Sequence, residues 1–269
     1  MKKLKTKSYI FIKRDKNVKI INYGKNTFEP ICAPKIKTID SSLNVCSKCI
    51  SIFATEISLK NHIELCSVPF LSFYEQKFKD GSILKFAKIS STAKKQALSI
   101  LGDALILKKT SYFDVENFDF YIVFDQEVKG YYSKYQGNDN SLSCLSVFPP
   151  FQKEGLGSLL IDLSQAFCNN TRINDTEVLN NKLYVSNSPE RPLSTQGAFC
   201  YRKYWKYKVI GGETINKIAQ NENLAIEDVV IGLEKNGFDF KTWKLEENIL
   251  INKPQKLLSK KLRVKQNIK

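Results

Sequence analysis

The sequence predicts an α+β fold in which antiparallel strands lead into one strand–loop–helix unit. From Phe73 the chain reads as strands interrupted by one helix, with a hairpin signal at 80–81. Residues 142–148 read as a buried strand that two prolines end, because proline cannot donate to a ladder. Beyond Leu156 the apolar residues recur at helical spacing, which predicts a helix that packs on this strand.

The other elements follow from local patterns. Residues 18–34 read as strand, turn at Gly24 and strand, and a helix is expected at 93–107. Two short helices are expected between 214 and 237, with Gly237 as the C-cap signal. Further strands are expected at 76–79, 83–89, 112–115, 118–124 and 130–134.

The charge lies at the two ends of the chain. The 269 residues are 42% hydrophobic and carry a net charge of +15, which allows one large domain or two small ones with ample core. Residues 1–25 hold nine Lys/Arg and one Asp, and residues 251–269 hold seven Lys/Arg and no acid. Basic tails on a neutral body suit a protein that lies against DNA, although charge runs can also be solvated faces.

Cysteine usage and hydropathy indicate the cellular compartment of the protein. No stretch approaches the ~20 apolar residues of a membrane span, and the apolar run at 9–12 is too short for a secretory signal. We therefore expect a protein that stays inside the cell and has no membrane partner. Seven cysteines, an odd number, then favour thiols and metal ligation over disulfides.

Four residues have the spacing of a zinc finger with Cys in the last place: Cys46, Cys49, His62 and Cys66. Zinc needs four such ligands at tetrahedral corners, and a CxxC knuckle plus a helix supplies them. Such a finger can read DNA, but the expected helix has few base-reading side chains and no tandem partner, which favours a structural role. His62 is the only histidine, so no histidine remains as a catalytic base.

The C-terminal helix pair allows two readings. Helix pairs of this kind can be helix-turn-helix DNA readers. However, Glu227 and Asp228 begin the second helix, where a helix facing phosphates would prefer cations. We therefore favour packing of this pair on the rest of the protein.

The turn at Gln152-Lys153-Glu154-Gly155-Leu156-Gly157 has the features of an anion site. A glycine-bearing turn that opens a helix directs unpaired N–H groups and the positive end of the helix dipole at one point, which suits a phosphate or pyrophosphate. A Walker loop is excluded because Ser158 and Leu159, rather than Lys and Ser/Thr, follow the last glycine. A dinucleotide fingerprint is one glycine short.

Three motifs together resemble the catalytic core of the MYST family of histone acetyltransferases. They are Ser-Cys-Leu-Ser-Val-Phe-Pro-Pro-Phe-Gln-x-x-Gly-Leu-Gly at 143–157, Ser-Pro-Glu-Arg-Pro-Leu-Ser at 188–194, and Tyr-Arg-Lys-Tyr-Trp at 201–205. The resemblance extends over 16–252 and implies an acetyl-CoA N-acyltransferase (GNAT-like) core. The implied parts are a basic tail at 1–15, a C2HC zinc finger at 44–70, the catalytic core at 71–208, a helix-turn-helix-like segment at 209–252 and a basic tail at 253–269.

The resemblance also implies an acetyl-CoA site. The backbone of 144–147 would bond the pantetheine like an added strand, and 152–158 would hold the pyrophosphate. The implied cofactor residues are Cys144, Leu145, Ser146, Val147, Gln152, Lys153, Glu154, Gly155, Leu156, Gly157, Ser158 and Ser194. Lys153 and Glu154 stand where the family generally has Arg and a basic or neutral residue, and a carboxylate beside a pyrophosphate is expected to weaken binding.

Acetyl transfer to lysine needs a base, because a free lysine has a pKa near ~10.4. Glu190 matches the general base of the family, although Ser188-Pro189-Glu190 is also how an ordinary helix begins. Cys144 matches the active-site cysteine, which either accepts acetyl in a ping-pong route or lies beside the thioester during direct attack. We favour direct attack. Lys109 matches the lysine that these enzymes autoacetylate.

The expected protein is thus a nuclear histone acetyltransferase and chromatin regulator. The resemblance favours the H4 tail as substrate and implies partner subunits in a chromatin complex, and the basic termini would contact nucleosomal DNA. The alternative from another class is a non-catalytic chromatin or DNA-binding protein built from the finger and the helix pair. A divergent paralogue with a non-histone substrate is a third reading.

Overall fold

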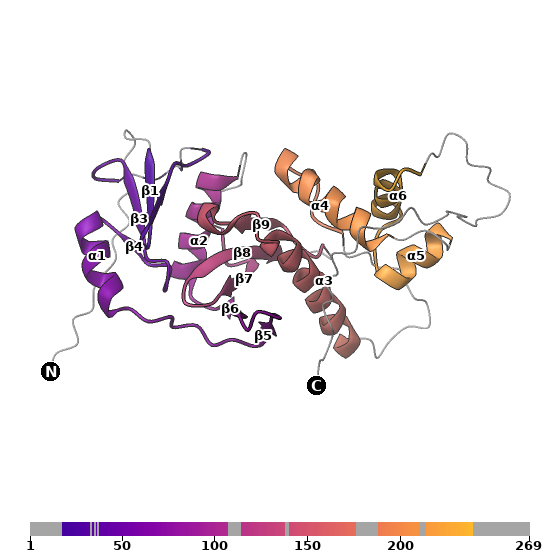
Figure 1. Cartoon of the computed structure of the whole chain (residues 1–269), viewed down its shortest axis with the longest axis horizontal. Coiled ribbons are helices and arrows are strands. Elements are labelled where there is room, and N and C mark those ends of the chain that lie inside the picture. The colour runs from indigo at the N-terminus through magenta and orange to yellow at the C-terminus, as the bar shows by residue number, and fades with distance from the viewer. Residues whose placement is uncertain are drawn as a thin grey trace. The chain divides into compact units, whose positions relative to one another are not determined.

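The computed structural model describes residues 18–32, 34, 36, 38–106, 114–137, 140–175, 188–209 and 214–238. They form a mixed α+β structure, as expected, with two compact units (Figure 1). The first unit extends to Tyr201 and the second begins at Arg202. None of the helices in these ranges is long and apolar enough to cross a bilayer.

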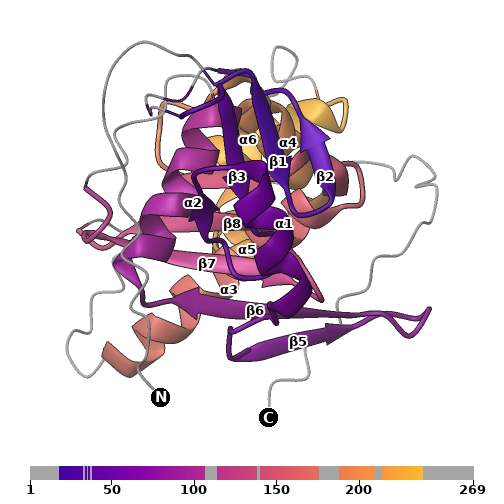
Figure 2. The ribbon, with the colours of Figure 1, turned by 90° about the vertical axis from the view of Figure 1, so that its left-hand side faces the viewer.

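A small sheet opens the first unit (Figure 2). Its strands are β1 (Ile20–Tyr23), β2 (Asn26–Phe28), β3 (Ser42–Val45) and β4 (Ile52–Phe53), in the order β2-β1-β3-β4. The expected turn at Gly24 is confirmed, with φ +62°, a region that glycine enters without steric cost. Helix α1 (Glu56–Leu65) follows, and the Thr55 side chain caps it by accepting from the Ser58 N–H.

The larger sheet is antiparallel and has the order β5-β6-β7-β8-β9. Its strands are β5 (Tyr74–Lys77), β6 (Ile83–Ile89), β7 (Phe118–Phe124), β8 (Val128–Tyr135) and β9 (Cys144–Val147). The predicted hairpin turn is present, because Gly81 has φ +86° and the Asp80 carboxylate accepts from the Ser82 N–H. The strand expected at 112–115 is not seen at its described residues, 114 and 115.

Two helices pack against this sheet. Helix α2 (Thr92–Leu105) buries Leu98, Leu101 and Leu105, which lie on one face at helical spacing. The 3₁₀ turn η1 (Pro149–Phe151) ends the run of β9, and α3 (Leu156–Asp175) begins directly after the glycine turn and contacts β8 and β9. The strand–loop–helix unit that the period change predicts is therefore confirmed.

The second unit is helical. Helix α4 (Thr195–Lys208) enters it at Arg202, and α5 (Ile215–Glu222) and α6 (Ile226–Lys235) follow, which confirms the expected helix pair. A Cβ on Gly232 would lie 2.9 Å from the Trp205 carbonyl oxygen, so glycine permits the close approach of α6 to α4. The Asn236 side chain donates to the Val209 carbonyl at 2.7 Å, and Gly237 ends α6 with φ +88°.

Candidate functional site

The four predicted metal ligands converge in space. Cys46 and Cys49 follow β3 in a knuckle closed by the Ile50 N–H, which donates to the Cys46 carbonyl at 2.8 Å. Helix α1 brings His62, and Cys66 follows its last turn. The ligand atoms all lie within 4.8 Å of one another, with Cys46 Sγ 3.8 Å from Cys66 Sγ and Cys49 Sγ 3.3 Å from His62 Nε2.

These distances fit zinc. Zinc–sulfur bonds of about 2.3 Å place two sulfurs about 3.8 Å apart in a tetrahedron. Leu59, Phe53 and Ile63 form a small hydrophobic core with the cluster. The Cys49 sulfur lies 3.2 Å from Ser51 Oγ, and Lys94 Nζ donates to that Oγ at 2.6 Å. The hydrogen bond from Cys46, followed by those contacts, lowers the pKa of Cys49, which favours the thiolate that zinc binds.

Polar contacts join the knuckle to the large sheet. The Val128 N–H donates to the Ser47 carbonyl at 2.8 Å, and the Tyr23 hydroxyl donates to the Val128 carbonyl at 2.6 Å. The Ser47 hydroxyl also donates to Glu127. Val128 begins β8, the strand that pairs with β9, so the position of the finger and the position of β9 are linked.

Strand β9 presents a free edge in the part of the chain that the structure describes. It is the last strand of its sheet, and Phe148 N–H donates to the Lys129 carbonyl at 2.9 Å. Because backbone groups alternate in direction along an antiparallel pair, those of Leu145 and Val147 point away from β8. The Gln152 side chain donates to the Val147 carbonyl on this edge at 3.0 Å.

Cys144 starts β9 and is half-buried. The Tyr131 hydroxyl lies 3.7 Å from its sulfur, and the Tyr131 ring is fully buried, where it stacks on Phe120. Burial, reinforced by Cys144, raises the pKa of Tyr131 well above its ordinary value, so this phenol stays protonated.

Glu190 lies beside the start of β9. The Ser141 N–H donates to the Ser188 carbonyl at 3.0 Å, and the Glu190 N–H donates to the Leu142 carbonyl at 2.9 Å. These two bonds hold residues 188–190 next to the segment that leads into Cys144. The Glu190 side chain is exposed, whereas Pro189 beside it is buried. The two predicted catalytic residues are therefore brought into one region.

The alternative reading of Glu190 as part of a helix start is wrong. Helix α4 begins at Thr195. Ser194 precedes it, and the Ser194 hydroxyl accepts from the Gly197 N–H at 3.0 Å, which is the geometry of an N-cap. Ser188 thus caps no helix, and Ser194, a predicted cofactor residue, has a capping role in the structure.

The glycine turn is open to solvent. Lys153 and Gly155 have positive φ angles, +68° and +86°, and the first helical bond is that of the Leu159 N–H to the Gly155 carbonyl. The N–H groups of 153–158 therefore meet no backbone acceptor among the described residues. A Cβ on Gly157 would meet no atom within 4 Å. The exposed turn is compatible with the predicted anion site, which stays a prediction. Lys109 lies outside the described residues.

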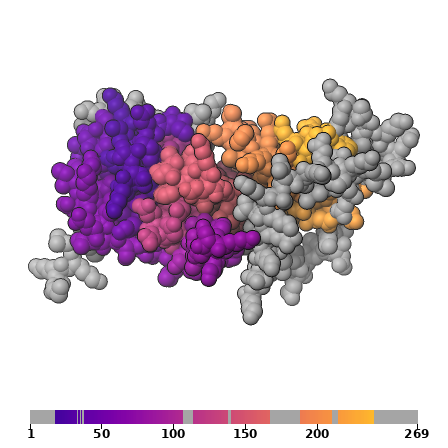
Figure 3. Space-filling model, viewed as in Figure 1, coloured from indigo at the N-terminus to yellow at the C-terminus, as the bar shows by residue number. Residues whose placement is uncertain are grey.

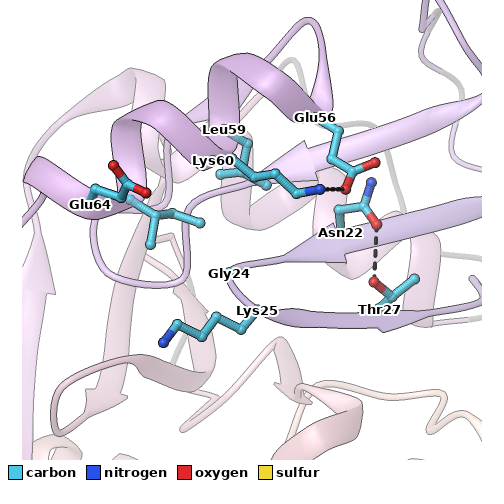
Figure 4. A pocket seen from close by; sticks show the side chains of 9 residues that line it. Asn22, Gly24, Lys25, Thr27, Glu56, Leu59, Lys60 and Glu64 are labelled. Carbon is cyan, nitrogen blue, oxygen red and sulfur yellow. Dashed lines mark hydrogen bonds and ion pairs between the residues drawn. The ribbon is translucent and has the colours of Figure 1, made fainter.

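A hollow of about 400 Å³ lies elsewhere, between the β1–β2 hairpin and α1 (Figure 4). It contains none of the predicted catalytic residues, and its charged side chains balance, with Lys60 paired to Glu56 at 2.6 Å. We place the candidate active site at β9 instead. The open strand edge and the Cys144 thiol lead directly into the glycine turn, and the bond of the Glu190 N–H to the Leu142 carbonyl brings the segment that carries the carboxylate to the start of this strand.

Comparison with known proteins decides the family. The model of the family described as MOZ/SAS matches residues 72–269. The chain belongs to the MOZ/SAS (MYST) family.

Named relatives of this MOZ/SAS chain are histone acetyltransferases. It is 29% identical over 250 residues to "Histone acetyltransferase Tip60 homolog" of Caenorhabditis elegans, covering 82% of this chain and 51% of the relative. It is 32% identical over 216 residues to "Histone acetyltransferase mst2" of Schizosaccharomyces pombe, covering 75% and 50%. Human "Histone acetyltransferase KAT6A" is 29% identical over 178 residues, covering 62% and 8%. The chain spans about half the length of the first two.

Sequence reasoning missed three features of the MOZ/SAS site. Neither the Tyr131 contact with Cys144 nor the Gln152 contact with Val147 was predicted, and the bond of Ser47 to Glu127 was not foreseen. Each joins residues whose local pattern is that of an ordinary strand, turn or knuckle. No signal in the sequence distinguishes them, because the partner lies on another element.

Proposed function

We propose that this chain is the catalytic part of a histone lysine acetyltransferase, with a GNAT-like core, that moves acetyl from acetyl-CoA to a lysine of a histone tail. The observation that carries the proposal is the backbone bond from Glu190 to Leu142, 2.9 Å long. This bond holds the Glu190 backbone beside the segment that leads into Cys144, which supports a role for the Glu190 carboxylate at the open edge of β9. The names of the relatives support the same reaction.

Acetyl-CoA would bind along the free edge of β9 and over the glycine turn. The outward backbone groups of Leu145 and Val147 can pair with the pantetheine amides as an added strand would. The Gln152 amide donates to the Val147 carbonyl in this structure. It would release that carbonyl, which could then accept a hydrogen bond from the pantetheine. The free N–H groups of 153–158 and the start of α3 would hold the pyrophosphate, with Lys153 as the nearby cation.

In the proposed mechanism Glu190 takes a proton from the lysine ammonium, because only the neutral amine attacks. The amine then adds to the thioester carbonyl and its nitrogen becomes positively charged. As the tetrahedral intermediate collapses, the C–S bond breaks and this nitrogen gives a proton to the departing thiolate, so that the amide and the coenzyme A thiol form. Cys144 lies beside the thioester and its sulfur does not need to carry the acetyl group. The exposed side chain of Glu190 is compatible with a substrate that arrives from solvent.

The zinc finger would be structural. Cys46, Cys49, His62 and Cys66 would hold one Zn²⁺ with no open position, so no water would be activated there. The finger would support β8 through the bonds of its knuckle. We propose the domain limits given above, with the finger at 44–70, the core at 71–208 and the helix-turn-helix-like segment at 209–252.

The glycine turn allows a test of cofactor binding. Gly157→Val is expected to weaken acetyl-CoA binding at least about tenfold, because the branched side chain would cover N–H groups that make charge-assisted bonds to the pyrophosphate. The fold should tolerate the change, since no atom lies within 4 Å of the new Cβ. Calorimetric titration with acetyl-CoA measures the affinity, and thermal unfolding controls for the fold. A variant that binds as tightly as the native chain would refute the placement of the pyrophosphate.

The proposed setting is the nucleus. The substrate is a histone tail, with H4 favoured, and the basic termini, 1–25 and 251–269, would contact nucleosomal DNA within a multisubunit chromatin complex. The test is acetyl transfer from labelled acetyl-CoA to H4 and H3 tail peptides by the purified chain. Transfer to H4 in excess of H3 is expected. Absence of both transfer and acetyl-CoA binding would overturn the proposal in favour of a non-catalytic chromatin protein.

A further inference from the structure

The outward face of α4 in the second unit is strongly basic. Helix α4 contains four Lys/Arg residues and no Asp or Glu. Arg202, Lys203 and Lys206 are exposed and lie at i, i+1 and i+4, so they share one side of the helix. Within the described residues, none of the three side chains makes a hydrogen bond or an ion pair. Residues of α4 form part of the surface in Figure 3, in orange.

Packing determines which face points outward. Trp205 and Val209 are buried, and the missing side chain of Gly232 lets α6 approach them closely. The Asn236 amide donates to the Lys206 carbonyl at 2.9 Å and to the Val209 carbonyl at 2.7 Å, which anchors the end of α4. The helix is therefore held in one rotation, and its three free cations are presented together.

The acids that the structure describes in the second unit lie on elements other than α4. Glu222, on α5, is 4.0 Å from Lys208, and Asp228, at the start of α6, is fully buried. Glu227 and Glu234 also belong to α6. The positive charge of Arg202, Lys203 and Lys206 is thus not neutralised by a described ion pair, which makes this face attractive to a polyanion.

We propose that Arg202, Lys203 and Lys206 bind the phosphate backbone of a DNA duplex. Phosphate binding needs exposed, unpaired cations and no apolar centre, whereas a protein interface has a core depleted of charge. From Arg202 to Lys206 the helix rises about 6 Å, and a duplex carries one charge per about 1.7 Å of its axis, so the three cations can reach neighbouring phosphates. DNA docks on α4, and not on α6, whose first turn is acidic.

The test compares two triple variants of the full chain that lose equal charge. One replaces the α4 cations: Arg202→Gln, Lys203→Gln and Lys206→Gln. The matched control replaces three other exposed lysines that make no described ion pair: Lys25→Gln, Lys77→Gln and Lys79→Gln. Fluorescence anisotropy with a labelled random-sequence duplex measures DNA affinity over a range of salt concentrations, and thermal unfolding confirms that both variants fold.

The slope of log affinity against log salt is the deciding quantity. Three lost phosphate contacts should make the slope less negative by about 2.7 in the α4 variant, while the control keeps the slope of the native chain. Equal slopes in the two variants would overturn the proposal. So would an α4 variant that binds DNA normally and loses binding to polyglutamate, since that result assigns the face to an acidic protein. The assay measures DNA binding and not acetyl transfer, so its result does not depend on whether the proposed acetyltransferase activity is correct.

Discussion

Glu190→Gln is expected to lower acetyl transfer to a histone tail peptide by about 10²- to 10⁴-fold, the usual contribution of a positioned general base. The amide cannot take the lysine proton, and no histidine is available to replace it, because the only histidine of the chain is among the predicted metal ligands. The substitution preserves the backbone, since the bond to Leu142 comes from the Glu190 N–H and not from its side chain. Steady-state kinetics with saturating acetyl-CoA measures the loss.

The control is Cys144→Ala, which separates direct attack from an acetylated intermediate. Direct attack requires no sulfur, so this variant should retain much of the native rate, although it loses the contact with Tyr131. Acetyl-CoA should still bind to both variants. The reverse pattern, with an active Glu190→Gln and an inactive Cys144→Ala, would rule out Glu190 as the base and favour the ping-pong route.

Loss of zinc is expected to cost several kcal/mol of folding free energy. Structural zinc supplies about 10–16 kcal/mol in zinc-finger peptides at neutral pH. Cys66→Ala removes one of the four converging ligands and should lower both the zinc content and the unfolding temperature. Acetyl transfer should fall as well, because the Ser47 carbonyl of the knuckle holds Val128 at the start of β8. Metal analysis and thermal unfolding measure the two effects.

Cys32→Ala serves as the matched variant, since Cys32 is half-buried and outside the cluster. It should keep one zinc per chain and an unfolding temperature close to the native value. Chelation of the native chain should reproduce the effect of Cys66→Ala and leave that variant little changed. Equal unfolding temperatures for the two Cys variants, or a native chain without zinc, would refute the structural role.

Local patterns were sufficient for much of the fold. The CxxC knuckle and the His and Cys one turn apart identify a metal cluster, because ligands so close in sequence need only a turn and a short helix to converge. The turn at Gly81 and the helix end at Gly237 were also predictable, since a positive φ angle at glycine depends on the residue itself. The strand expected at 142–148 was too long, because β9 pairs with β8 only from Cys144 to Val147.

The sequence by itself determined the α+β class, the cluster of three Cys and one His, and the glycine turn that opens α3, because each depends on spacing within a short segment. Only the tertiary structure decided that Glu190 lies beside β9 and that α4 begins after it. It alone decided that Arg202, Lys203 and Lys206 face outward, since the close contact at Gly232 sets the rotation of α4. Such features depend on bonds and packing between segments far apart in the chain, which no local pattern encodes.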